Sequence, residues 1–367
     1  MSKLVLHIGT HKTGTTAIQK VFAANRARLA SHGIIYPDFG LQQVKRNTVG
    51  RRALSNIREC FAQRGILLPG FEGSAAHHSL LASWVDLPVT QPSTLPVQTL
   101  LADLSRAHAD SNRTVILSSE EFSRAKGGRT GQGPDLRVIR KYLAGFDEIQ
   151  VVCLLRHQIP FLQSLYQEVS KFIVPPDPSI LINRATKSGY GVGMFMDFNL
   201  LLDRLSEAFP TDRLTFIDYE RAAQGVEGVS GALLAAIEHS TVATHLRSPG
   251  DGRANVSPPP LAVLLANRIS EPNMPAYRRL DATMEYLQNN FDLNRKTTIF
   301  TRDQCHQMAA HFAPLNHTFE TRVKALYPAN TPLYRITGPD IHNLTHPEEL
   351  DAAPSGNLGP ALDQGTQ

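Results

Sequence analysis

The chain has 367 residues, of which 42% are hydrophobic and 19% are charged, a composition typical of a globular protein and unlike that of a disordered chain. Its 37 Lys and Arg residues against 33 Asp and Glu give a net charge of +4 without a basic stripe, so we expect no nucleic-acid partner and favour a small polyanionic ligand. Because it has neither a signal-peptide pattern nor an apolar run of about 20 residues, we expect a cytoplasmic protein without an integral membrane segment.

Short apolar segments alternate with helical patterns along the chain. The segments rich in Val, Ile and Leu predict buried strands at 4–8, 114–118, 150–155 and 213–217. Their nearly continuous apolar character is typical of strands that are covered on both faces. The amphipathic segments between them predict helices at 16–31, 136–144, 160–172 and 197–209. This alternation predicts an α/β fold with a parallel sheet flanked by helices.

The remaining segments are expected to decorate this sheet. We interpret 36–90 as an insertion and about 258–330 as a helical C-terminal part of a single domain over 1–347. The Gly- and Pro-rich stretches 126–134 and 173–193 are predicted to be long irregular loops, of the kind that often serve as lids or binding loops. The last residues, 348–367, are predicted to be a disordered tail.

The first expected strand leads into a loop that can cradle a phosphate. It reads Gly9-Thr10-His11-Lys12-Thr13-Gly14-Thr15-Thr16 and runs into a helix. The start of a helix presents free backbone N–H groups to an anion, and glycines let the backbone approach a phosphate closely. The glycine spacing is that of a Walker A loop, but Thr15 and Thr16 stand where that loop has its Lys and Ser/Thr. The lysine stands at Lys12 instead, which argues against a nucleotide kinase.

The segment HIGTHKTGTTAIQ resembles the 5′-phosphosulfate-binding loop of bacterial sulfotransferases that use 3′-phosphoadenosine 5′-phosphosulfate (PAPS). The resemblance implies a P-loop NTPase-like sulfotransferase fold, PAPS as co-substrate and adenosine 3′,5′-bisphosphate as product. We expect no metal, because a singly charged sulfuryl group needs less charge shielding than a phosphoryl group. The residues that the resemblance assigns to the phosphosulfate are His11, Lys12, Thr13, Gly14, Thr15 and Thr16.

A second likeness lies at the end of the third predicted strand. Arg156 follows Leu154-Leu155, and Ser164 comes eight positions later in the next helix. This spacing resembles the family's 3′-phosphate site, and a guanidinium fork suits a phosphate. For Arg156 a surface salt bridge is the alternative. The stretch RLTFIDYERA, with Tyr219 and Glu220, also resembles one that the family carries late in its fold, although packing would explain it equally well.

Sulfuryl transfer to a hydroxyl needs a base for the acceptor's proton and positive charge at the departing oxygen. We assign Lys12 to the second task. For the first we favour Glu120, at the end of the strand 114–118, because carbohydrate-sulfating members of the family often use a glutamate. Glu121, expected on the other face, and His11, at the loop apex, are the alternatives. We interpret His7, inside the first strand, as a core histidine.

The sequence therefore predicts a PAPS-dependent sulfotransferase. The resemblance favours a hydroxyl or amine acceptor, either a small molecule or, with greater preference, a saccharide or a lipid-linked glycan. Two other functions remain open. An ATP-dependent P-loop kinase is disfavoured by the missing Walker lysine, whereas a non-catalytic nucleotide-binding module is compatible with every motif above.

Overall fold

The computed structural model describes residues 1–37, 77, 81, 97–108, 112–125, 133–210, 212–247, 257–271, 276–291, 296–327, 336 and 338–351. Most of the predicted insertion 36–90 and of the loop 126–134 lies outside these residues. Contacts between residues divide the chain into two compact units. The first comprises Met1–His157, Val192–Ala254 and Pro314–Thr337, and the second comprises Gln158–Gly191, Asn255–Ala313 and Gly338–Gln367. The single domain over 1–347 stays a prediction.

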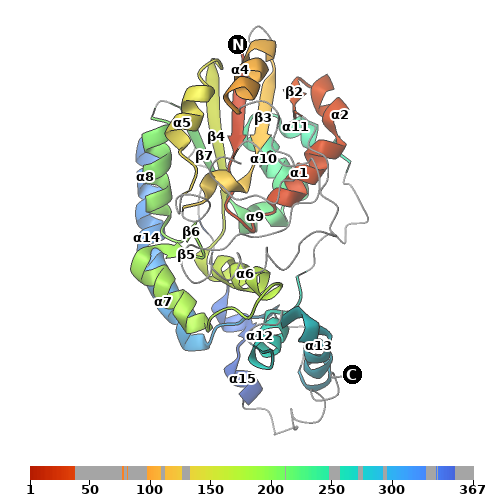
Figure 1. Cartoon of the computed structure of the whole chain (residues 1–367), viewed down its shortest axis with the longest axis vertical. Coiled ribbons are helices and arrows are strands. Elements are labelled where there is room, and N and C mark those ends of the chain that lie inside the picture. Colours follow the sequence, from red (N-terminus) through yellow and green to blue (C-terminus); the bar gives the residue numbers. More distant parts are fainter. Residues whose placement is uncertain are drawn as a thin grey trace. The chain divides into compact units, whose positions relative to one another are not determined.

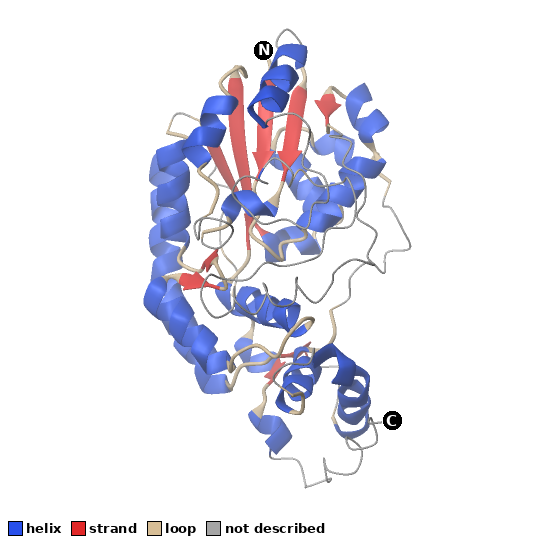
Figure 2. Ribbon diagram, viewed as in Figure 1, coloured by secondary structure: helices blue, strands red, loops and turns tan. Residues whose placement is uncertain are grey.

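The first unit is built on a five-stranded parallel sheet with the strand order β2-β3-β1-β4-β7 (Figure 2). The predicted α/β fold with a parallel sheet flanked by helices is therefore confirmed. All four predicted strands form, and the short edge strand β2 is additional. The bounds are β1 Lys3–His7, β2 Ile34–Ile35, β3 Thr114–Ser118, β4 Glu148–Leu155 and β7 Arg213–Asp218.

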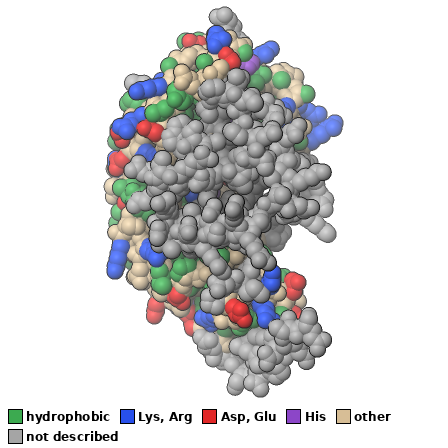
Figure 3. All heavy atoms as spheres, viewed as in Figure 1, with side chains coloured by type: hydrophobic (Ala, Val, Ile, Leu, Met, Phe, Trp, Pro, Cys, Tyr) green, Lys and Arg blue, Asp and Glu red, His purple; other side chains and the backbone are tan. Residues whose placement is uncertain are grey.

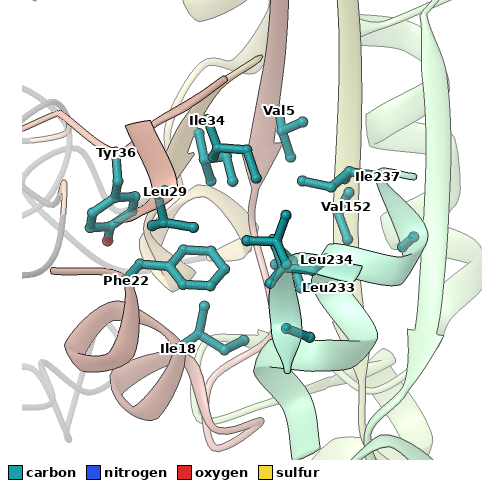
Figure 4. Packing of buried hydrophobic residues seen from close by; sticks show 14 of the residues in the cluster. Val5, Ile18, Phe22, Leu29, Ile34, Tyr36, Val152, Leu233, Leu234 and Ile237 are labelled. Atoms are coloured by element: carbon teal, nitrogen blue, oxygen red, sulfur yellow. The ribbon is translucent and has the colours of Figure 1, made fainter. Parts of the chain in front are cut away.

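One face of the sheet is covered by α1 (Thr15–Ala24), α2 (Arg26–Ser31) and the helices that follow β7 (Figure 1). Figure 4 shows Ile18 and Phe22 of α1 meeting Leu233 and Leu234 over Val5 of β1. The predicted helix 16–31 is interrupted at Asn25, whose side-chain amide donates to the carbonyl oxygens of Val21 and Arg247. The helices after β7 are α9 Tyr219–Gln224, α10 Gly228–Ala236 and α11 Ser240–Ala243.

The opposite face of the sheet packs against α8 (Phe198–Ala208) and the part of α14 (Arg302–Leu326) that begins at Pro314. The ring of Phe319 lies 5.2 Å from that of Phe216 in β7 and 5.9 Å from that of Phe198, centroid to centroid. On the same side, α5 (Leu136–Tyr142) packs against α8, and α4 (Val97–His108) packs against α5. Helices thus cover both faces, as the apolar strands predicted.

The second unit is mainly helical, and α12 lies at its core with seven consecutive buried residues, Leu261–Asn267. Two predictions are wrong in detail. The stretch 173–193, expected to be irregular, contains α7, which Asp177 caps and Gly189 ends in a left-handed conformation. The part about 258–330, expected to be helical, also contains the short strand β8, which pairs in parallel with β9 further along the chain. The bounds are α6 Gln158–Ser170, α7 Pro178–Ser188, β5 Tyr190–Gly191, α12 Pro260–Arg268, η4 Ala276–Arg279, α13 Leu280–Asn290, β8 Lys296–Thr297, η6 Ile341–Asn343, β9 Leu344–Thr345 and α15 Glu348–Asp351.

Helix α15 occupies the first four residues of the predicted tail 348–367, and the rest of that tail lies outside the described residues. On the face shown in Figure 3, Lys and Arg side chains are interspersed with Asp and Glu side chains along the described surface. Among the helices that the structure describes, none is long and apolar enough to cross a membrane.

Candidate active site

The candidate site lies at the carboxyl ends of the parallel strands of the first unit. Strand β1 is flanked by β3 on one side and by β4 on the other. Strands β2 and β3 form one half of the sheet and β4 and β7 form the other half, so the strand order switches direction at β1. In doubly wound sheets such a switch point is where ligands bind. The segments that meet there follow β1, β3, β4 and β7, and they carry Lys12, Glu120, Arg156 and Glu220 respectively.

The loop after β1 continues along β4 before it turns. Ile8 donates its backbone N–H to the Val152 carbonyl oxygen, and Thr10 donates both its N–H and its hydroxyl to that of Leu154, at 3.0 and 3.1 Å. Two left-handed residues then reverse the chain, Lys12 with φ of 63° and Gly14 with φ of 74°. A left-handed lysine is uncommon and is found where surrounding structure holds it. The backbone of Lys12 is therefore fixed at the turn, while its side chain remains partly exposed.

The start of α1 offers backbone donors to an anion. Gly14 stands at the N-cap, where it contributes no capping side chain, and the first turn carries no acidic residue. Within the described ranges, no protein atom accepts a hydrogen bond from the backbone N–H of Gly14, Thr15 or Thr16. Thr16 is exposed and Gly14 is partly exposed, so the start of the helix is open to a ligand at these two residues, whereas Thr15 is buried. Such an arrangement of N–H groups at a helix start binds phosphate or sulfate.

A second set of unsatisfied polar atoms surrounds Gly9. The Nε2 atom of His7 and the Oγ1 atom of Thr15 are buried and have no hydrogen-bond partner among the described residues. A Cβ atom on Gly9 would lie 2.9 Å from the first and 3.1 Å from the second. Buried polar atoms without partners are rare in native proteins and indicate a missing water or ligand. They are a second observation, independent of the helix start, that favours a polar ligand at this loop.

The interpretation of His7 as a core histidine accounts for one of its two ring nitrogens. Its Nδ1 lies 2.8 Å from the Ser118 hydroxyl, as expected of a satisfied buried ring, but its Nε2 has no such partner in the described structure. Burial lowers the pKa of His7 to about 3. The ring is therefore neutral at physiological pH and carries one N–H.

Glu120 begins η3 (Glu120–Ser123), directly after β3. Its Oε2 accepts a hydrogen bond of 3.3 Å from the amide of Gln19 on α1. Burial raises the pKa of Glu120, and the nearby His11 opposes that shift. The hydroxyl of Ser123 donates to the Gly9 carbonyl oxygen at 3.2 Å. The segment with the candidate base is thus tied to the segment that would bind the anion.

Glu121, the alternative base, forms an ion pair with Arg124. It is buried and accepts hydrogen bonds from Nε and Nη2 of Arg124, itself 1% exposed. Nε2 of His11 lies 3.5 Å from Oε1 of Glu121. His11, expected at the loop apex, is therefore buried, 4% exposed, and directed at this ion pair. The geometry favours Glu120 over Glu121 as the base, because a carboxylate that balances a buried guanidinium cannot readily take a proton.

Arg156 joins the end of β4 to the loop. Its Nη1 donates to the Lys12 carbonyl oxygen at 3.2 Å, and its guanidinium lies 5.1 Å from the Tyr219 ring centroid. Its Nε donates to Oε1 of Glu220 at 3.2 Å, and the backbone N–H of His157 donates to Oε2 of Glu220 at 3.3 Å. Burial raises the pKa of Glu220 to about 7, although Arg156 and the His157 N–H favour the charged form.

Ser164 lies on α6 in the second unit and is buried there. Its assignment to the same phosphate as Arg156 stays a prediction. Gln19 ends the quoted segment HIGTHKTGTTAIQ, but the sequence assigns it no role, and Ser118 belongs to no motif beyond its strand. Only their positions on α1 and β3 link these two side chains to the site. Tyr219 and Glu220, which the sequence singled out by resemblance without a role, follow directly on β7 and so lie at the same sheet edge.

A scan against models of protein families found no family that matches the chain, and a search of curated proteins found no match either. The functional assignment therefore depends on the residues and contacts described above.

Proposed function

We propose that this protein is a PAPS-dependent sulfotransferase with a P-loop NTPase-like sulfotransferase fold. The loop 9–16 would hold the 5′-phosphosulfate, Arg156 would hold the 3′-phosphate, and Glu120 would act as the base. The acceptor would be a hydroxyl or amine of a saccharide or a lipid-linked glycan. The partner is thus a small anionic nucleotide together with an acceptor, and no metal is assigned a role.

The observation that carries the proposal is the set of unsatisfied donors around one left-handed lysine. Free N–H groups at the start of α1 and the buried, unpartnered Thr15 hydroxyl lie within eight consecutive residues that also contain the left-handed Lys12. Arg156 contacts the carbonyl oxygen of that same Lys12. A cation and several neutral donors within eight residues suit a doubly anionic ligand such as a phosphosulfate. The lysine position and the threonines at the Walker positions favour the sulfuryl donor over ATP.

In the proposed reaction the acceptor oxygen attacks the sulfur in line with the departing oxygen. A bond forms between the acceptor oxygen and sulfur, and the bond between sulfur and the bridging oxygen of the 5′-phosphate breaks. The electron pair of that bond leaves with adenosine 3′,5′-bisphosphate. Glu120 takes the acceptor proton, and Lys12 with the N–H groups of α1 stabilises the charge that grows on the phosphate.

The raised pKa of Glu120 suits its proposed task. A base with a pKa nearer to the working pH combines a sufficient ionised fraction with a stronger pull on the proton. Gln19 holds Oε2 of the carboxylate through its amide. The Glu120 carboxylate is the group that we assign to the acceptor's proton.

The test is a transfer assay with isotopically labelled PAPS and a panel of saccharide and lipid-linked alcohols, read by mass spectrometry. We expect a sulfated product from the wild-type chain and none from Lys12→Ala. Glu227→Gln provides a control, because Glu227 is exposed at the start of α10 and has no role in the proposed site.

Two other results would overturn the proposal. A kinase would give a phosphorylated product with ATP and magnesium and bind the bisphosphate no better than ATP. A non-catalytic module would bind adenosine 3′,5′-bisphosphate and give no product with any member of the panel.

A further inference from the structure

Arg156 has a second partner that competes for the group it would bind. Its Nε donates to Glu220, its Nη1 donates to the Lys12 carbonyl oxygen, and Tyr219 lies beneath its plane. The Arg156 side chain is 21% exposed and that of Glu220 is 22% exposed. The guanidinium is therefore partly open to a ligand, but its Nε edge already holds an anion.

A phosphate and the Glu220 carboxylate would compete for that edge. A guanidinium binds a phosphate best with two parallel N–H groups, and the edge formed by Nε and one Nη nitrogen is one of the two pairs that Arg156 can offer. The Nη1 nitrogen, needed for the other pair, already donates one N–H to Lys12. A dianionic phosphate next to an ionised Glu220 would also bring like charges together in a partly buried place, which is costly.

We propose that Glu220 is a built-in counter-ion of Arg156, which the 3′-phosphate of the bound nucleotide displaces and which takes up a proton as it is displaced. This inference rests on the proposed function, because it assigns Arg156 to the 3′-phosphate. It adds that binding of nucleotides with a 3′-phosphate is coupled to protonation. Nucleotides without that phosphate leave the Arg156–Glu220 pair intact and bind without proton uptake.

The surroundings of Glu220 favour its protonated form once the phosphate has displaced it from Arg156. Burial raises the pKa of Glu220 to about 7 even with Arg156 beside it, so the loss of that cation raises it further. Asp218, at the end of β7, is the nearby acid and disfavours a second negative charge. His157 does not replace the cation, because burial lowers its pKa to about 4 and its ring is neutral. Helix α10, which packs against α9, contains no titratable side chain.

The protonated acid keeps one of its partners. The carbonyl oxygen of a neutral carboxyl group still accepts the hydrogen bond from the His157 N–H, and its O–H becomes a donor. The site therefore avoids a buried charge without partners, the costly outcome of breaking such a pair.

The sign of the pH effect follows from this scheme. Below pH 7 Glu220 is already largely protonated, so a further decrease in pH does not raise the affinity for the bisphosphate through this group. Above pH 7 each unit of pH lowers the affinity by up to about tenfold, until the pKa of Glu220 in the complex is reached. The phosphate groups titrate near pH 6 and act in the opposite direction at lower pH, so the comparison must be made with a variant that lacks the carboxylate.

The experiment is calorimetric titration at pH 8 with adenosine 3′,5′-bisphosphate, in two buffers of different ionisation enthalpy. Adenosine 5′-monophosphate, which lacks only the 3′-phosphate, is the control ligand. We expect the wild-type chain and Glu227→Gln to take up about one proton with the bisphosphate and none with the monophosphate. Glu220→Gln should bind the bisphosphate roughly three- to thirtyfold more tightly without proton uptake, and bind the monophosphate unchanged.

Two results would overturn the inference. Weaker binding of the bisphosphate to Glu220→Gln would make Glu220 a positioning residue that holds Arg156 for the phosphate. Binding to the wild-type chain without proton uptake would overturn it even if the variant failed to fold. If the wild-type chain does not bind the bisphosphate, the proposed function fails instead, which the same titrations reveal.

Discussion

The guanidinium of Arg156 donates from Nη1 to the carbonyl oxygen of Lys12 over 3.2 Å, and this bond links two strand ends. Lys12 belongs to the loop after β1, and Arg156 follows β4. The two cations that we assign to opposite ends of the nucleotide are thus coupled through a backbone atom of one of them. A change at Arg156 should therefore affect the 3′-phosphate strongly and the loop weakly.

Arg156→Ala separates these two effects. Charge-assisted hydrogen bonds contribute ~1.5–3 kcal/mol, so the affinity for adenosine 3′,5′-bisphosphate should fall roughly ten- to a hundredfold. The affinity for adenosine 5′-monophosphate should fall less than about tenfold, because among the contacts that Arg156 makes only the one with Lys12 reaches the loop. Calorimetric titration of both ligands measures the ratio, and equal losses would remove Arg156 from its assigned role.

Glu120→Gln and Glu121→Gln should fail in different ways. Glu120→Gln removes only the proton acceptor, so turnover should fall by ~10²–10⁴-fold with an unchanged affinity for the bisphosphate. Glu121→Gln removes the Glu121 carboxylate from its ion pair with the buried Arg124, which costs ~3–5 kcal/mol of the free energy of unfolding. Denaturant unfolding together with the transfer assay distinguishes them. Full activity of Glu120→Gln would transfer the role of base to another residue, with His11 as the first to test.

Gly9→Ala tests the arrangement around the loop. The added methyl group would lie 2.9 Å from His7 Nε2 and 3.1 Å from the Thr13 and Thr15 hydroxyl oxygens, so the loop must shift. We expect a loss of ~1–3 kcal/mol in the free energy of unfolding, together with a loss of bisphosphate affinity. Gly225→Ala is the control, because its φ of −66° is ordinary and the nearest atom is the Ala222 carbonyl oxygen at 3.3 Å. Equal losses for both variants would contradict this geometry.

The stability of the ligand-free protein should depend on Glu220 as pH changes. Its pKa is about 7 in the folded chain against an ordinary value of 4.5. The folded state thus holds a proton that the unfolded state has lost between these values, so stability should fall as pH rises from about 4.5 to 7. The change should be on the order of 1–3 kcal/mol. Chemical unfolding across this range should show a shallower slope for Glu220→Gln, and the same slope in both chains would contradict the shift.

The strands and the loop could be predicted because their signals are local. Apolar runs mark β1, β3, β4 and β7, and the glycines around Lys12 mark the turn. The edge strand β2 could not be predicted, since only Ile34 and Ile35 form it. Helix α7 could not be predicted either, because it follows a proline-rich stretch and begins with Pro178 itself. The pairs Glu121–Arg124 and Arg156–Glu220 show the limit in the site. The residues of the first pair are close in sequence, but the sequence does not show that the pair is buried. The second pair joins residues 64 positions apart that only the sheet brings together.

The most direct measurement of the central claim is thermal unfolding of the wild-type chain with two nucleotides. If adenosine 3′,5′-bisphosphate occupies the loop, a concentration of about 100 times its dissociation constant stabilises the fold by ~2.7 kcal/mol. We predict a clear rise in melting temperature with the bisphosphate, a smaller one with ATP and magnesium, and loss of the first in Lys12→Ala. A rise with ATP and magnesium and none with the bisphosphate would contradict the assignment.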